Sequence, residues 1–90
     1  MGAAQAYLDY TAFSRGGLIG QLVYETYTKE VAEFAVDSLD VDWKEQAYLM
    51  AKAYLDHTSF SIGSLTEQLE FEKFTTSQAK YGATKAYKEQ

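Results

Sequence analysis

The sequence predicts an all-α protein, a tandem repeat of two three-helix, helix-turn-helix-like units. The segment Ala6–Thr28 recurs as Ala53–Thr75 at an offset of about 47 residues, which is typical of helical repeats. The chain has no proline and is rich in Ala, Leu, Glu, Gln and Lys, all good helix formers. Residues that favour the start of a helix stand before five of the six expected helices, namely Ser14, Thr28, Asp42, Ser61 and Thr75. We expect the first unit to span residues 1–40 and the second residues 41–90.

The first helix of each unit is predicted over Ala3–Ala12 and Lys44–His57. Asp42 is a suitable N-cap for the longer of these helices, and Glu45 stands three residues further on, as in a capping box. That helix carries apolar residues at the spacing of one helical face, namely Ala47, Met50, Ala51, Tyr54 and Leu55.

The second helix of each unit is predicted to begin at Ser14 and at Ser61, where a serine side chain can cap the first turn. An apolar residue precedes each cap and another follows four residues after it, the arrangement of a hydrophobic staple. The two pairs are Phe13 with Leu18 and Phe60 with Leu65.

The third helices are predicted to begin after Thr28 and Thr75, and Gln78 gives the second of them a capping box. The connection between the units is short and holds no glycine or proline. We therefore expect the two units to pack together, with Val41 and Trp43 near their junction.

The composition excludes several classes of protein. A chain of 90 residues allows one compact domain or two very small repeated units. The absence of cysteine excludes disulfides, thiolate metal sites and a cysteine nucleophile. A net charge of −5 argues against nucleic-acid binding, which needs clustered Lys and Arg. The apolar runs are too short to span a bilayer.

The sequence predicts no catalytic residue. His57 ends a predicted helix, where the helix dipole favours a positive charge, and its counterpart in the first unit is Tyr10. Ser61 is better explained as a helix cap than as a nucleophile. A triad of Ser61, His57 and Asp56 would crowd neighbouring residues around one helix end, without a visible oxyanion site.

No cofactor or metal site is predicted either. The segment Asp40–Glu45 resembles the start of a calcium loop, but it lacks the third alternating ligand, the central glycine and the final glutamate. Gly16, Gly17 and Gly20 do not follow a strand and are not followed by Lys-Ser or Lys-Thr, so they do not form a phosphate loop. We expect Gly16 and Gly20 to let another helix approach closely.

Two sets of residues allow both a structural and a binding role. Glu25 and Glu72 lie beside the leucine stripe of their helices, and we expect them to accept hydrogen bonds from a tyrosine hydroxyl or from the amides of a helix start. Most of the aromatic side chains are expected in the core, whereas Tyr10, Tyr24 or Tyr48 could anchor a protein partner.

The two copies differ in charge at one outward face. Glu67 and Glu70 stand where the first unit has Gly20 and Val23. These acidic residues are either a solvated face or a docking surface for a basic protein segment. The predicted protein-binding residues are Asp56, Glu67, Glu70, Asp40 and Asp42.

The repeated sequence motifs resemble those of a known protein family. Each copy has a helix with YLD near its end, an FS turn, a G-x-L-x-x-QL helix and an E-x-aromatic-T turn, and DWKEQA opens the second copy. This set of sequence motifs, which covers nearly the whole chain, resembles the repeat of the host cell surface-exposed lipoproteins of Gram-positive bacteria and their phages. The phage-encoded members are lipid-anchored and mediate superinfection exclusion, blocking the entry of DNA from an incoming phage.

The resemblance implies an extracytoplasmic, non-enzymatic protein-binding module without a cofactor. Its implied partner is a phage protein of the DNA-injection machinery, such as the tape measure protein, and not a nucleic acid. The alternative is a repeat protein of the host cell envelope with no phage role. Since the sequence has no lipidated cysteine, we expect membrane attachment only through a lipid anchor outside this chain, and the chain alone to be soluble. The sequence leaves the oligomeric state open.

Overall fold

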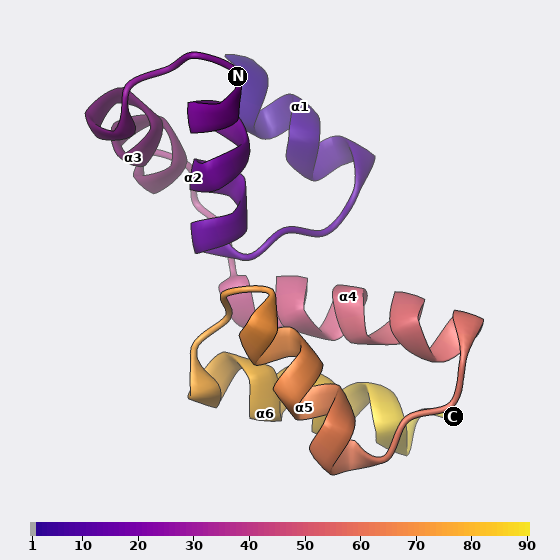
Figure 1. Cartoon of the computed structure of the whole chain (residues 1–90). Coiled ribbons are helices and arrows are strands. Elements are labelled where there is room, and N and C mark those ends of the chain that lie inside the picture. The colour runs from indigo at the N-terminus through magenta and orange to yellow at the C-terminus, as the bar shows by residue number, and fades with distance from the viewer. Residues whose placement is uncertain (1) are drawn as a thin grey trace.

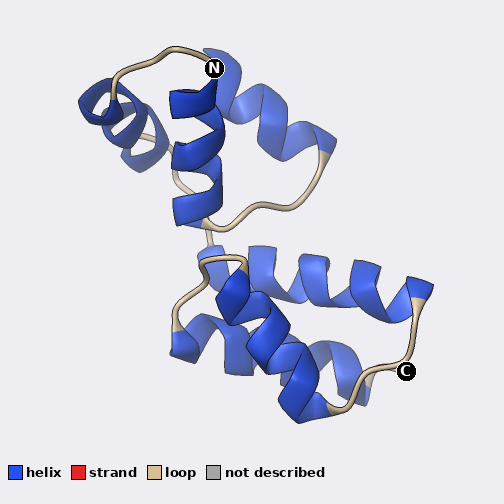
Figure 2. Ribbon diagram, in the orientation of Figure 1, coloured by secondary structure: helices blue, strands red, loops and turns tan. Residues whose placement is uncertain are grey.

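The computed structural model describes residues 2–90, which form helices and connecting loops without any strand (Figures 1 and 2). This confirms the predicted all-α fold. Met1, the first residue of the predicted first unit, lies outside the described residues. The helices are α1 (Gly2–Tyr10), α2 (Arg15–Tyr24), α3 (Lys29–Asp37), α4 (Trp43–His57), α5 (Ile62–Phe71) and α6 (Thr76–Lys88).

The helices gather around two hydrophobic cores. The first triplet, α1–α3, lies at one end of a molecule 37 Å long and about 20 Å across, and the second triplet, α4–α6, lies at the other (Figure 1). The core of the first triplet consists of Ala4, Leu18, Ile19, Leu22, Ala32 and Val36. The core of the second consists of Ala47, Tyr48, Ala51, Leu65, Leu69, Phe74, Ala79, Ala83 and Ala86. The boundary at residues 40 and 41 stays a prediction.

Capping side chains begin the helices where the sequence predicts them. Ser14 Oγ accepts a hydrogen bond from the backbone N–H of Gly17 at 2.9 Å, and Ser61 accepts the equivalent bond from Ser64 at 3.1 Å. In α6, Thr75 and Gln78 form the predicted capping box.

The caps of α3 and α4 are also formed, with one difference from the prediction. Thr28 caps α3 by accepting from Val31, and Asp42 caps α4 by accepting from the N–H groups of Lys44 and Glu45. The side chain of Glu45 faces Lys85 instead of completing a capping box, with 3.7 Å between Oε1 and Nζ.

Helices α2 and α5 end in the same tight turn. The backbone N–H of Tyr27 donates to the carbonyl of Leu22, and that of Phe74 donates to Leu69, both at 3.2 Å. This is the bond pattern of a Schellman motif, which requires a left-handed residue just after the helix. Thr26 and Lys73 occupy that position with φ of 79°, although neither is a glycine.

Helix α1 ends at Tyr10, two residues before the predicted end. The residues before the Ser14 cap leave the helix because an N-cap residue needs an extended backbone; Ser14 has ψ of 163°. Helix α1 has 9 described residues, whereas α4 in the second triplet has 15.

Glycines permit two close approaches. A Cβ on Gly82 would lie 2.5 Å from the backbone carbon of Ala47, so α4 and α6 pack with their backbones nearly in contact. A Cβ on Gly16 would lie 3.0 Å from Cβ of Lys73, so the first triplet meets the α5–α6 turn here. The expectation for Gly20 is wrong, because nothing lies within 4 Å of a Cβ placed there.

The triplets meet through specific polar contacts. Ser14 is buried and its hydroxyl donates to the backbone carbonyl of Glu72. The backbone N–H of Phe13 donates to Oε1 of Gln46 at 3.0 Å. Trp43, the first residue of α4, packs against the core of the first triplet, as predicted for a residue near the junction.

Candidate functional site: two acidic surfaces

The outer face of α5 carries two of the predicted binding residues. Glu67 and Glu70 are three residues apart and therefore share one side of the helix; Glu67 is exposed and Glu70 partly exposed. The Ser61 cap and the packing of Leu65 and Leu69 hold this helix against the second core. The helix therefore presents both carboxylates on one side.

Neither of these two carboxylates has a cationic partner within residues 2–90. Within residues 2–90, ion pairs join Arg15 to Asp37 and Lys85 to Glu45, and neither includes Glu67. Glu70 is likewise outside these pairs. An external cationic group would meet them without breaking an existing salt bridge.

Asp40 and Asp42 lie elsewhere, around a hollow of about 310 Å³ between α1 and the start of α4. Asp9 of α1 and Glu45 of α4 line the same hollow, so four carboxylates surround it. Neither α5 nor Asp56 contributes to it; Asp56 is exposed in the last turn of α4. The predicted residues therefore do not form one site.

Asp9 was not among the predicted site residues. The repeat could have pointed to it, because Asp9 is the counterpart of Asp56, which was predicted. Its position beside Asp40 depends on how α1 packs on the connection between the triplets, and no local sequence pattern specifies that packing.

The net charge of the chain is divided unevenly between the two predicted units. Residues 1–40 contain six carboxylates and two cationic side chains, a net charge of −4. Residues 41–90 contain seven carboxylates and six lysines, a net charge of −1. In the second triplet the lysines therefore nearly balance the carboxylates, and α5 is a local exception because it carries Glu67 and Glu70 and no lysine.

Several of these lysines gather around two tyrosine rings on α4 and α6. Lys85 Nζ lies 4.3 Å from the ring centre of Tyr48 and 5.8 Å from that of Tyr81. Lys44 lies 5.6 Å from the ring of Tyr81, and Lys52 lies 5.4 Å from the ring of Tyr48. Three lysines of the second triplet thus lie against tyrosine rings of α4 and α6.

Glu25 and Glu72 have the predicted structural role. The hydroxyl of Tyr7 donates to Glu25, and the hydroxyl of Tyr54 donates to Glu72 at 2.5 Å. The hydrogen bond to Glu25 raises the pKa of Tyr7. Burial, followed by the bond to Glu72, raises the pKa of Tyr54. Each of the two carboxylates therefore accepts a hydrogen bond from a tyrosine of its own triplet.

The three tyrosines considered as anchors differ in accessibility. Tyr10 and Tyr24 are 87% and 84% exposed, so each is available to a partner. The expectation for Tyr48 is wrong, because its ring is buried between α4 and α6. Its hydroxyl donates to Glu89, and this bond raises the pKa of Tyr48 to about 12.

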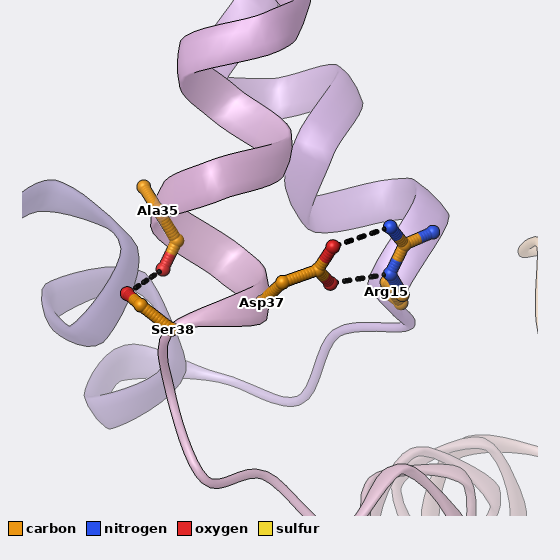
Figure 3. A network of polar contacts seen from close by, with 4 residues as sticks. All are labelled: Arg15, Ala35, Asp37 and Ser38. Carbon is orange, nitrogen blue, oxygen red and sulfur yellow. Dashed lines mark hydrogen bonds and ion pairs between the residues drawn. The ribbon is translucent and has the colours of Figure 1, made fainter.

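A bidentate ion pair joins α2 to α3 in the first triplet (Figure 3). Arg15 Nε and Nη2 donate to the two carboxylate oxygens of Asp37 at 2.7 and 2.9 Å. The guanidinium holds the pKa of Asp37 below its ordinary value. The counterparts in the second triplet are Ile62 and Thr84, so the repeat does not preserve this pair.

The side chains considered for catalysis are dispersed on the surface. Asp56, His57 and Ser61 are all exposed, and Ser61 caps α5. Within residues 2–90, no three His, Asp or Glu side chains are placed so that they could hold a metal ion. Each helix of the described chain is too short or too polar to cross a membrane.

The comparisons with known proteins identify the family. The family model described as host cell surface-exposed lipoprotein matches residues 1–39 and 42–85. The first matched segment contains α1–α3, and the second contains α4, α5 and most of α6. Searches of the curated proteins and of the solved structures found no match to the chain. Because the two matched segments cover nearly the whole chain, it belongs to the host cell surface-exposed lipoprotein family.

Proposed function

We propose that this chain is a non-enzymatic, extracytoplasmic protein-binding module of a superinfection exclusion lipoprotein. It blocks the injection of phage DNA by binding the tape measure protein of the incoming phage. The family match, together with the resemblance to phage-encoded members, supports this role. A protein anchored on the outer surface of the host meets the injection machinery before the DNA enters the cytoplasm.

The observation that carries the proposal is the free acidic face of α5. Glu67 and Glu70 stand on a capped helix and lie outside the internal ion pairs of residues 2–90. In α2, the first triplet has the exposed Gly20 and Val23 at the matching positions. Since the buried Leu18 and Leu22 of α2 recur as Leu65 and Leu69 in α5, this charge difference concerns the surface and not the core.

The chemistry of the face indicates the kind of partner segment. Two carboxylates on one side of a helix attract a lysine- or arginine-rich segment, which increases the rate of association and the specificity. Asp56, at the exposed end of α4, adds a further negative charge to the second triplet. A basic, amphipathic helical segment of the tape measure protein fits this face.

A pair of charge reversals tests the assignment. The variant Glu67→Lys with Glu70→Lys is compared with Glu30→Lys and Glu33→Lys, two glutamates at the same spacing on α3. Both variants change the net charge equally, so a difference in capture between them reports where the charge lies on the surface and not how much charge was changed. We expect capture of immobilised tape measure protein to fall about tenfold only for the α5 variant. Equal capture by all three proteins would remove α5 as the site.

The second candidate is a repeat protein of the host envelope without a phage role, and the family description supports it equally. The discriminating measurement is phage DNA entry into a sensitive host that displays the lipid-anchored chain. Unchanged DNA entry would favour the envelope role.

A further inference from the structure

We propose that the outer face of α6 docks on an anionic phospholipid surface. This surface of the protein, called the α6 face below, consists of Lys80, Tyr81, Thr84, Lys85, Tyr87 and Lys88. It shares no residue with the acidic face of α5, so the two surfaces are independent.

Helix α6 separates its buried residues from its outer residues. The buried residues are small, namely Ala79, Gly82, Ala83 and Ala86. At 3.6 residues per turn, the members of the α6 face fall on the opposite side and occupy about half of the helix circumference. The helix is therefore amphipathic, and its outer side is formed by lysines, tyrosines and a threonine.

The α6 face is positively charged. Residues 76–88 contain three lysines and no Asp or Glu, a net charge of +3. Lys80 and Lys88 are exposed and lie outside the ion pairs found within residues 2–90. The nearby carboxylates are engaged elsewhere, because Glu45 faces Lys85 and Glu89 accepts a hydrogen bond from the Tyr48 hydroxyl. Two exposed ammonium groups thus remain for an external anion.

The first triplet shows that the fold does not require this charge. In α3, Glu33 stands at the position of Lys80, and Asp37 stands at the position of Thr84. Residues 29–37 contain one lysine and three carboxylates, a net charge of −2. The third helix of the triplet therefore changes from acidic to basic between the two copies, and the change lies on its outer side.

The shape and chemistry of the α6 face suit phosphate groups at a lipid surface. An open hollow of about 460 Å³ is lined by Lys80, Tyr81, Thr84, Lys85 and Lys88. Ammonium groups form strong, charge-assisted hydrogen bonds with phosphate oxygens. Tyr81 and Tyr87 are 41% and 40% exposed. Lysine and tyrosine side chains are apolar along their length and polar at the tip, so they lie well at the level of lipid headgroups.

The composition of α6 favours a lipid surface over an acidic protein segment. A protein interface has an apolar centre, but residues 76–88 contain no Leu, Ile, Val, Phe or Met. The family adds a second reason, because a lipoprotein is held beside a bilayer. Even weak binding is effective at the high local concentration that such attachment creates.

The net charge of −5 does not prevent docking. Exposed charges farther apart than about 8 Å are largely screened at physiological ionic strength. The first triplet, with a net charge of −4 over residues 1–40, lies at one end of a molecule 37 Å long, and α6 lies at the other (Figure 1). A bilayer in contact with α6 therefore interacts mainly with the local positive charge.

The test measures binding of the full chain to lipid vesicles by co-sedimentation. One set of vesicles contains phosphatidylcholine alone, and the other contains equal parts of phosphatidylcholine and phosphatidylglycerol. We expect binding to the anionic vesicles and none to the neutral vesicles. Binding should weaken as salt is raised, because the attraction between lysines and headgroups is screened.

Two matched double variants locate the surface. Lys80→Gln with Lys88→Gln removes two charges from the α6 face, whereas Lys29→Gln with Lys73→Gln removes two charges from the start of α3 and the α5–α6 turn. All four side chains are exposed, so the fold should be kept, and circular dichroism checks this. We expect binding to the anionic vesicles to weaken about tenfold or more for the α6 variant only.

Three results would overturn the proposal. The first is that the chain binds neither type of vesicle or binds both equally, and the second is that the two variants lose binding equally. The third is tighter binding to a polyglutamate peptide than to anionic vesicles at equal concentration of negative charge, which would make an acidic protein segment the occupant. These measurements involve neither the tape measure protein nor α5, so they succeed or fail separately from the proposed function.

Discussion

The hydroxyl of Tyr54 donates a hydrogen bond to the carboxylate of Glu72, and 47 residues earlier in the chain Tyr7 donates to Glu25 in the same way. In each triplet the tyrosine belongs to the first helix and the glutamate caps the end of the second. The bond joins these helices at the edge of the core, where an unpaired carboxylate would be costly. The repeat therefore conserves a complete polar contact as well as its apolar stripe.

Replacing Tyr54 by phenylalanine should destabilise the protein by about 1–2 kcal/mol, because Glu72 loses a hydrogen-bond donor and the apolar contact remains. Urea denaturation monitored by circular dichroism measures the change. As a control, Tyr24→Phe removes a hydroxyl from a side chain that is 84% exposed, and we expect a change within about 0.5 kcal/mol. Equal effects of the two substitutions would contradict a stabilising role for the Tyr54–Glu72 bond.

The contact between Gly82 and Ala47 gives a second prediction. Gly82→Ala should cost about 1–3 kcal/mol, because the new Cβ would lie 2.5 Å from the backbone of Ala47 and would force α4 and α6 apart. In contrast, Gly20→Ala should stabilise the protein by about 0.5–1 kcal/mol, since nothing lies within 4 Å of the new Cβ and alanine is the better helix former. Thermal denaturation of the two variants should shift in opposite directions; a shift in the same direction would be inconsistent with this packing.

The left-handed residues after α2 and α5 give a third prediction. Thr26→Gly should stabilise the protein by about 1 kcal/mol, because a side chain at φ of 79° is strained and glycine is not. Lys73→Gly should have a smaller effect, since lysine is not β-branched and its side chain lies beside Gly16. If Thr26→Gly lowers the free energy of unfolding, the turn geometry is not as described.

The bond from Tyr48 to Glu89 predicts a dependence on alkaline pH. It raises the pKa of Tyr48 from its ordinary value of 10.0 to about 12, because the neutral phenol donates and the phenolate cannot. The stabilisation is therefore complete below pH 10 and is lost as the pH rises toward 12. The free energy of unfolding of Tyr48→Phe, measured from pH 9 to 12, should fall less steeply than that of the native protein. Parallel curves would contradict the assignment.

Much of the fold follows from local chemistry that the sequence displays. Ser14, Ser61 and Thr75 begin helices because their side chains accept from the backbone three residues later, and this pattern is readable without coordinates. The role of Glu25 and Glu72 could also be predicted, because helical spacing places them beside a leucine stripe. Each of these patterns occurs in both copies of the repeat, and this recurrence strengthened the predictions.

The sequence was less informative wherever the outcome depended on contacts between distant helices. Gly20 and Gly82 are both helical glycines, but only the second meets another backbone, because Gly82 is buried against α4 whereas Gly20 lies on an exposed face of α2. Tyr48 was placed wrongly for the same reason: its burial depends on α6. Asp9 joins Asp40 and Asp42 through the packing of α1 on the junction.

The most direct test of the proposed function is phage DNA entry into a sensitive Gram-positive host that displays the lipid-anchored chain on its surface. Three forms are compared at equal surface abundance: the native chain, Glu67→Lys with Glu70→Lys, and the control Glu30→Lys with Glu33→Lys. We predict that the native and control forms reduce DNA entry and that the α5 variant restores it to the level of cells without the chain. DNA entry that is equally high in all cells, or equally reduced by all three forms, would contradict a binding module that acts through the acidic face of α5.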